Sequence, residues 1–176
     1  MLEVMTNAAD RSSVVRQLVV DRLEYSYNLA RLLTGDRALA EEATHEAVIR
    51  ALRAADGLRD PAAFDAWFRR ILVNSCRDAL RHRRDRVIPG LSPPSVVPDP
   101  APRLAERDAM SQALASLTAE HREVIVLRFY ADLPVEAIAA SLGIRVGTAK
   151  SRLHRALEQL RAAYDASARP PAEVSR

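Results

Sequence analysis

The stretch from Val135 to Leu160, VEAIAASLGIRVGTAKSRLHRALEQL, constrains the fold more than any other part of the chain. Apolar residues recur at helical spacing on both sides of Gly143, so the stretch predicts two helices that pack together. Gly143 can adopt a positive φ without steric cost and therefore suits the end of the first helix. This is the pattern of a helix-turn-helix, whose second helix lies in the DNA major groove.

The second helix of this stretch has an apolar side and a polar side. The apolar side is formed by Ala149, Leu153, Leu157 and Leu160. The polar side is basic and rich in hydrogen-bonding groups, which suits base edges in the major groove. It consists of Lys150, Ser151, His154 and Arg155. The alternative is an ordinary helical hairpin with a solvated charged side. The spacing, the turn glycine and the basic side together favour DNA binding.

The composition predicts an all-helical protein. Of the 176 residues, 48% are hydrophobic but only 5% are aromatic, and there are only five glycines. Alanine, leucine, arginine and glutamate are abundant, and these residues favour helices. The single cysteine, Cys76, cannot form an internal disulfide, which fits a reducing cytosol. No run is apolar and long enough to span a membrane, and the N-terminus lacks a signal-peptide core. We therefore expect a cytoplasmic protein.

Three helices are expected in the first half, at about residues 14–33, 37–54 and 62–84. Asp36 precedes the second of these helices and can cap it. The outer side of the second helix is the most acidic in the chain. Its charged residues are Glu41, Glu42, Glu46 and Arg50. A charged side of this kind is most often simply solvated.

The third expected helix begins with aromatic residues and continues with a strongly basic side. The aromatic residues are Phe64, Trp67 and Phe68. Aromatic groups at the start of a basic helix, next to a loop, can hold unstacked bases of a single strand. For these aromatic side chains alone, a place in the hydrophobic core is the favoured interpretation.

Proline divides the chain. The segment from Ile88 to Pro102 contains six prolines, so it cannot be helical and is expected to be an extended linker. We therefore predict a helical domain at 14–87, a linker at 88–102 and a second helical domain at 103–165. The second domain begins with a helix from about Arg103 to Leu117, and Thr118 can cap the next helix.

Three motifs in this order, across a proline-rich linker, carry a resemblance to a known family. They are TGDRALAEEATHEAVIRAL from Thr34, FDAWFRRILVNSCRDALRHRR from Phe64, and LPVEAIAASLGIRVGTAKSRLHRALEQLR from Leu133. On these motifs the chain resembles an extracytoplasmic-function (ECF) sigma factor of bacterial RNA polymerase. The first domain is similar to sigma region two and the second to region four.

The resemblance implies a division of labour. The sigma subunit binds core RNA polymerase, region four reads the −35 promoter element as duplex, and region two opens the −10 element and holds a flipped base. The implied −35 contacts are Arg145, Thr148, Lys150, Ser151, His154 and Arg155. The implied −10 contacts are Leu58, Arg59, Asp60, Asn74, Arg77 and Arg81. The implied polymerase contacts are Glu42, Glu46, Ile49 and Arg50.

The resemblance also implies which partners to expect. They are the β′ clamp helices and β flap of core polymerase, promoter DNA, and an anti-sigma factor, with no direct membrane insertion. No cofactor, metal or catalytic residue is expected, because the cysteine and the four histidines show no metal-ligand spacing. The alternative function is a helix-turn-helix regulator that acts without docking on core polymerase and usually dimerises on a palindrome.

Overall fold

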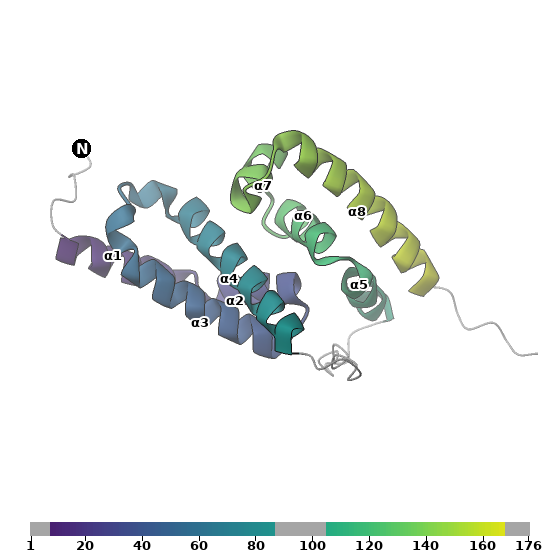
Figure 1. Cartoon of the computed structure of the whole chain (residues 1–176), viewed down its shortest axis with the longest axis horizontal. Coiled ribbons are helices and arrows are strands. Elements are labelled where there is room, and N and C mark those ends of the chain that lie inside the picture. The colour runs from purple at the N-terminus through teal and green to yellow at the C-terminus, as the bar shows by residue number, and fades with distance from the viewer. Residues whose placement is uncertain (1–7, 87–104, 168–176) are drawn as a thin grey trace, which may run out of the picture. The chain divides into compact units, whose positions relative to one another are not determined.

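A computed structural model of the chain describes residues 8–86 and 105–167 (Figure 1). Every element in these residues is a helix or a short 3₁₀ turn. The helices are α1 (Ala8–Asp21), α2 (Leu23–Thr34), α3 (Arg37–Arg53), α4 (Phe64–Arg86), α5 (Ala105–Ser116), α6 (Ala119–Phe129), α7 (Val135–Leu142) and α8 (Val146–Ser167). The 3₁₀ turns are η1 (Ala55–Gly57) and η2 (Pro61–Ala63), both between α3 and α4.

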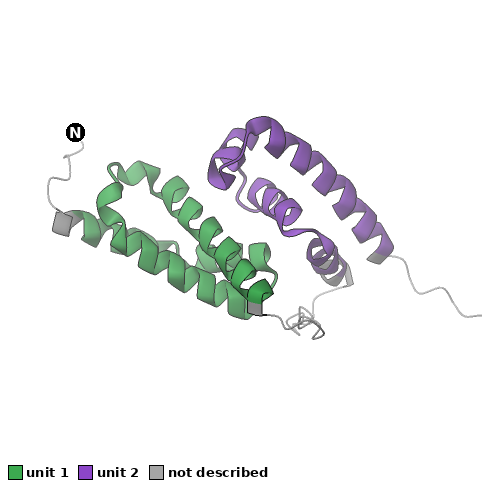
Figure 2. Cartoon of the chain, in the orientation of Figure 1, with its two compact units in different colours: residues 1–93 green, residues 94–176 purple. Residues whose placement is uncertain are grey.

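The chain forms two compact units, residues 1–93 and 94–176 (Figure 2). This confirms the predicted all-α class with two small helical domains. The predicted linker at 88–102 lies outside the described residues. The domain limits of 14–87 and 103–165 stay predictions.

In the first unit, α2, α3 and α4 pack against one another. The buried side of α3 is made mainly of alanine, including Ala40, Ala43 and Ala47, so neighbouring helices can approach closely. Larger side chains complete the core, among them Leu33 of α2 and Leu72 of α4. The core also includes Phe64 and Phe68, as predicted, while Trp67 is half-buried.

Asp36 fixes the start of α3, as the sequence predicts. Its Oδ1 accepts a hydrogen bond from the backbone N–H of Leu39 at 3.0 Å. Its Oδ2 accepts a second bond, at 2.8 Å, from Nη1 of Arg83 near the end of α4. One carboxylate thus caps α3 and holds the C-terminal part of α4 beside it.

The expected single helix at 14–33 is wrong, because the structure breaks it at Arg22. This residue has φ −107° and ψ 3°, outside the helical conformation, and separates α1 from α2. The break lets α1 contact η1 and α3, while α2 contacts α3 and α4. No glycine or proline marks the position, so the reason lies in this tertiary packing rather than in local sequence.

In the second unit, α8 contacts α5, α6 and α7. Thr118 caps α6 as predicted, and its Oγ1 accepts from the N–H of His121 at 3.3 Å. The predicted apolar side of α8 is only partly buried. Ala149 is 1% exposed, but Leu157 is 40% exposed and lies outside the core, where Ala156 takes a buried position instead.

Arg122 closes the C-terminal end of α5. Its guanidinium donates hydrogen bonds to the carbonyl oxygens of Leu114 at 3.0 Å, Ala115 at 3.0 Å and Leu117 at 3.1 Å. The last carbonyls of a helix have no partner within the helix, so a cation here satisfies them and complements the helix dipole. Burial lowers the pKa of Arg122, because desolvation disfavours its charged form.

Candidate nucleic-acid and partner interfaces

The helix-turn-helix has the geometry that the sequence predicts. Gly143 ends α7 with φ 66°, in the left-handed conformation that glycine adopts without strain. The N–H of Ile144 reaches back to the carbonyl of Ala139 at 3.0 Å, which satisfies a terminal carbonyl of α7. Three residues after Gly143, α8 begins at Val146. The turn is therefore short and fixed by backbone hydrogen bonds.

An exposed polar face follows the first half of α8. Spacings of three and four residues bring Thr148, Ser151 and Arg155 onto one side, with His154 beside them. His154 Nε2 lies 3.8 Å from Oε1 of Glu158. Ser151, His154 and Arg155 are exposed and Thr148 is partly exposed, so the structure brings these predicted residues together. We call these four residues the recognition face.

Two further predicted residues flank the recognition face. Arg145 directly precedes α8 and is exposed, and its carbonyl accepts from the N–H of Ala149 at 3.0 Å. Lys150 is also exposed, but it lies on the edge of α8, about 100° around the helix from Ser151. Both cations therefore border the recognition face and are accessible to solvent.

Contacts with α6 hold α8 in place. Arg152 Nη2 lies 3.0 Å from Oε2 of Glu120, and its side chain is only 23% exposed. About two helical turns further along α8, Gln159 Oε1 lies 2.7 Å from Nδ1 of His121. These two pairs link α6 to α8 along a line between the buried side of α8 and the recognition face. The recognition face is therefore left open on a helix whose orientation is fixed.

A row of four arginines and one asparagine runs along α4. Asn74, Arg77 and Arg81 were predicted from the resemblance, and spacings of three and four place them on one side of the helix. The same spacing adds Arg70 and Arg84, both exposed, which the sequence analysis left out. The row spans about 21 Å, at 1.5 Å per residue. We call these five residues the α4 row. Such a row matches the charge of a nucleic-acid backbone.

The three predicted residues in the loop before α4 differ in their exposure to solvent. Leu58 is 3% exposed, so its side chain belongs to the core and does not face solvent. Arg59 and Asp60 are exposed, and Asp60 Oδ1 accepts from the N–H of Ala62 at 2.9 Å. The sequence around Leu58 could not show whether this side chain is buried in the core or exposed to a ligand. In this conformation only Arg59 and Asp60 offer side chains to a ligand.

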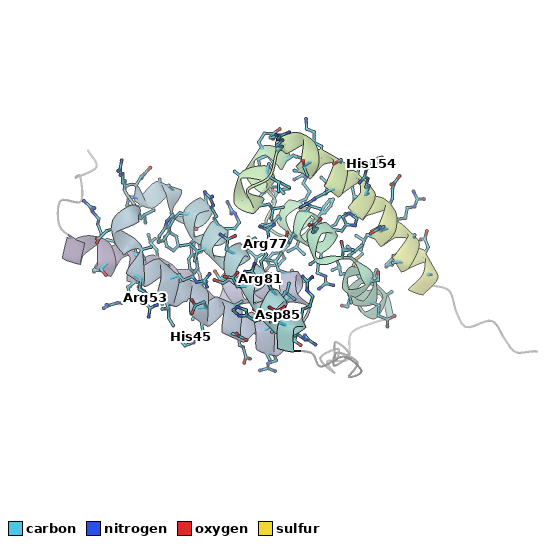
Figure 3. All side chains as sticks on the ribbon, viewed as in Figure 1. His45, Arg53, Arg77, Arg81, Asp85 and His154 are labelled. Carbon is cyan, nitrogen blue, oxygen red and sulfur yellow. The ribbon has the colours of Figure 1, made fainter. Side chains whose placement is uncertain are left out.

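The outer side of α3 brings together three of the four predicted polymerase contacts. Glu42, Glu46 and Ile49 follow one another at helical spacing, and the same spacing adds Arg53, which the sequence analysis missed. In Figure 3, Arg53 and His45 project from α3 away from α4, whereas Arg77 and Arg81 project from α4. The outer side of α3 and the α4 row therefore face different directions on the first unit.

The fourth predicted contact, Arg50, points across to α4. Its Nε donates to Oε1 of Glu46 at 2.8 Å, and its Nη1 donates to Oδ2 of Asp78 at 2.8 Å. The other oxygen of Asp78, Oδ1, accepts from Nη2 of Arg81. The hydrogen bonds to Asp78 and Glu46 raise the pKa of Arg50, because both favour its charged form. Four alternating charges thus link α3 to the α4 row.

Two other kinds of site are not found among the described residues. Across residues 8–86 and 105–167, no group of three or more histidine, cysteine, aspartate or glutamate side chains could hold a metal ion. None of the helices described in the structure is both long and apolar enough to cross a membrane.

Both units match models of known protein regions. Residues 14–86 match Sigma-70 region 2, and residues 113–162 match Sigma-70 region 4. The ECF RNA polymerase sigma factor SigL of Mycobacterium tuberculosis is 34% identical over 167 residues, covering 92% of this chain and 94% of SigL. The RNA polymerase sigma-E factor of Streptomyces avermitilis is 35% identical over 133 residues, covering 75% of this chain and 74% of that factor.

Two solved structures share this fold. The sigma factor RpoE, in a complex with the anti-sigma factor NepR from Bartonella quintana, has a TM-score of 0.73 and 26% identity, with 85% of this chain and 96% of that chain covered. CnrH, in a complex with the cytosolic domain of CnrY, has a TM-score of 0.64 and 27% identity, with 90% and 95% covered. These similarities cover both units and not only the helix-turn-helix. They therefore do not favour the alternative function, a helix-turn-helix regulator that acts without docking on core polymerase. The chain belongs to the ECF sigma factors of bacterial RNA polymerase.

Proposed function

We propose that this chain docks on core RNA polymerase through the outer side of α3 and reads promoter DNA with two separate surfaces. The recognition face of α8, flanked by Arg145 and Lys150, would read the −35 element as duplex. The α4 row and the loop residues Arg59 and Asp60 would hold the opened −10 element. The observation that carries the proposal is that one chain presents two basic surfaces on different units.

The two surfaces suit different forms of DNA. A helix with one polar, exposed face fits the major groove of a duplex, where base edges present distinct donor and acceptor patterns. The α4 row offers five side chains along about 21 Å of helix, which fits the repeated charges of one strand. Two readers on one chain bind a promoter more tightly and selectively than either reader alone.

The outer side of α3 suits a protein partner rather than DNA. Glu42 and Glu46 would repel phosphates, whereas they complement a basic protein surface. Ile49 adds a partly exposed apolar side chain about one helical turn after Glu46. We infer that this surface meets the β′ clamp helices of core polymerase, while the second unit meets the β flap.

Membership of the family also supports inferences about an anti-sigma partner, catalysis and cellular location. RpoE and CnrH are solved with an anti-sigma factor and with CnrY, respectively, and we infer that an anti-sigma factor also controls this chain. Sigma factors are not known as enzymes, so we infer that the chain has no catalytic residue, cofactor or metal. We infer a cytoplasmic location without membrane insertion, because its proposed partners are polymerase and DNA.

Footprinting of the reconstituted holoenzyme tests this function. The purified chain is mixed with sigma-free core polymerase from the same bacterium and with a promoter fragment. We expect protection of the duplex at −35 and permanganate-reactive thymines at −10, both absent when the chain is omitted, and reactive thymines absent when core polymerase is omitted. Protection at −35 by the chain alone, with no effect of polymerase and no opened bases, would contradict the proposal and support a regulator.

A further inference from the structure

One carboxylate connects the two functional surfaces of the first unit. Asp78 of α4 accepts from Arg50 of α3 at 2.8 Å through Oδ2, and from Arg81 of the α4 row through Oδ1. Arg50 is held in turn by Glu46 at 2.8 Å. The chain of contacts therefore begins at a proposed polymerase contact and ends at a proposed −10 contact.

The position of Asp78 makes its contacts more than surface ion pairs. Its side chain is 27% exposed, against 59% for Asp65, the carboxylate of the first turn of α4 that pairs with Arg22. Partial burial reduces screening by solvent, and a carboxylate that accepts from two guanidinium groups restricts the rotamers of both. Arg81 uses one nitrogen for this bond and keeps its other donors, because a guanidinium carries five N–H groups.

We propose that Asp78 is a positioning residue that holds Arg50 for polymerase docking and Arg81 for the −10 strand, so that the two contacts depend on one carboxylate. The inference rests on the proposed function, which assigns Arg81 to the −10 strand, and on the resemblance, which implies that Arg50 contacts polymerase. Asp78 itself lies between the two arginines and needs no contact with either partner. Its role is to remove the conformational freedom that each arginine would otherwise lose on binding.

The test replaces Asp78→Asn, which keeps the shape and removes the charge, and uses Asp65→Asn as the matched control on the same helix. Affinity for core polymerase is measured by fluorescence anisotropy of the labelled chain. Strand affinity is measured with the holoenzyme and a fluorescein-labelled single strand taken from the −10 region of a promoter that the wild-type protein opens. A strand of the same bases in scrambled order gives the non-specific background.

We expect Asp78→Asn to weaken both affinities about fivefold, the effect of losing one well-ordered charged contact. We expect Asp65→Asn to leave both within about twofold, because its ion pair is exposed. Binding of the scrambled strand should be unchanged, since non-specific attraction needs charge rather than a fixed side-chain position.

Two double variants distinguish a positioning role of Asp78 from a general loss of structure. In each, Asp78→Asn is added to a protein that already lacks one of the two arginines. In Arg50→Ala, adding Asp78→Asn should cost no more polymerase affinity but should still weaken strand binding. In Arg81→Ala, the same addition should cost no more strand affinity but should still weaken polymerase binding. Equal losses in every background, or no loss beyond that of Asp65→Asn, would overturn the proposal. If the wild-type chain itself failed to bind polymerase, the proposed function would fail instead.

Discussion

Replacing Arg122 with methionine removes the group that closes α5 and is expected to destabilise the second unit selectively. Methionine keeps the unbranched apolar stem of the side chain but loses all the donors. The carbonyl oxygens of Leu114, Ala115 and Leu117 then lose partners that now lie 3.0, 3.0 and 3.1 Å away.

The magnitude follows from where these hydrogen bonds lie. The bonds to Leu114 and Leu117 are partly buried, and a hydrogen bond from a charged group contributes about 1.5–3 kcal/mol. The bond to Ala115 is exposed, so water can replace it at little cost. The two partly buried bonds, each at the low end of this range, together indicate a loss of about 3 kcal/mol in the free energy of unfolding. In a domain of this size that corresponds to a fall in Tm of about 12–24 °C.

The chain offers an internal reporter for this test. Its single tryptophan, Trp67, lies in α4 of the first unit, so tryptophan fluorescence follows that unit alone, whereas circular dichroism follows all helices. In Arg122→Met, part of the circular-dichroism signal should melt earlier while the Trp67 transition stays in place. The matched control is Arg161→Met on α8, where the arginine is exposed and the change should stay within about 0.5 kcal/mol.

Equal melting curves for Arg122→Met and Arg161→Met would refute the assignment of Arg122 as the residue that closes α5. A shift of the Trp67 transition as large as the shift in circular dichroism would refute the claim that the effect belongs to the second unit.

Three other substitutions test separate parts of the account. Arg155→Ala is expected to weaken −35 duplex binding by about 1–3 kcal/mol through loss of a base-edge contact, and an unchanged footprint would remove Arg155 from the recognition face. Glu46→Arg is expected to reduce polymerase affinity by charge reversal while −35 duplex binding by the chain stays intact, and unchanged polymerase affinity would show that this side of α3 does not dock. Gly143→Ala is expected to cost about 1 kcal/mol of stability, because φ is 66° there; urea unfolding measures this cost, and wild-type stability would contradict it.

Local signals in the sequence predicted the parts of the fold that depend on neighbouring residues. Asp36 and Thr118 were predicted as helix caps and are caps, and Gly143 ends α7 as expected. Each of these depends on a few residues of backbone and one side chain, so a short window contains the whole cause. The polar side of α8 was predictable for the same reason, since helical periodicity alone places its members together.

Contacts between distant segments could not be predicted in this way. Arg50 was expected on the polymerase surface, and only the packing of α3 against α4 shows that Asp78 holds it. Leu58 was expected to contact DNA, but its side chain is buried in the core. The break at Arg22 likewise has no local cause and follows from the packing of α1 and α2 on different partners. These features need the tertiary arrangement, which periodicity does not contain.

Transcription in a purified system tests the central claim most directly. Sigma-free core polymerase from the same bacterium is supplied with the chain and a library of that bacterium's promoter fragments, and transcript starts are sequenced. The account predicts transcripts from a defined set of starts that share −35 and −10 elements and disappear when the chain is omitted. An absence of specific transcripts, while a control sigma factor initiates normally on the same polymerase, would contradict it.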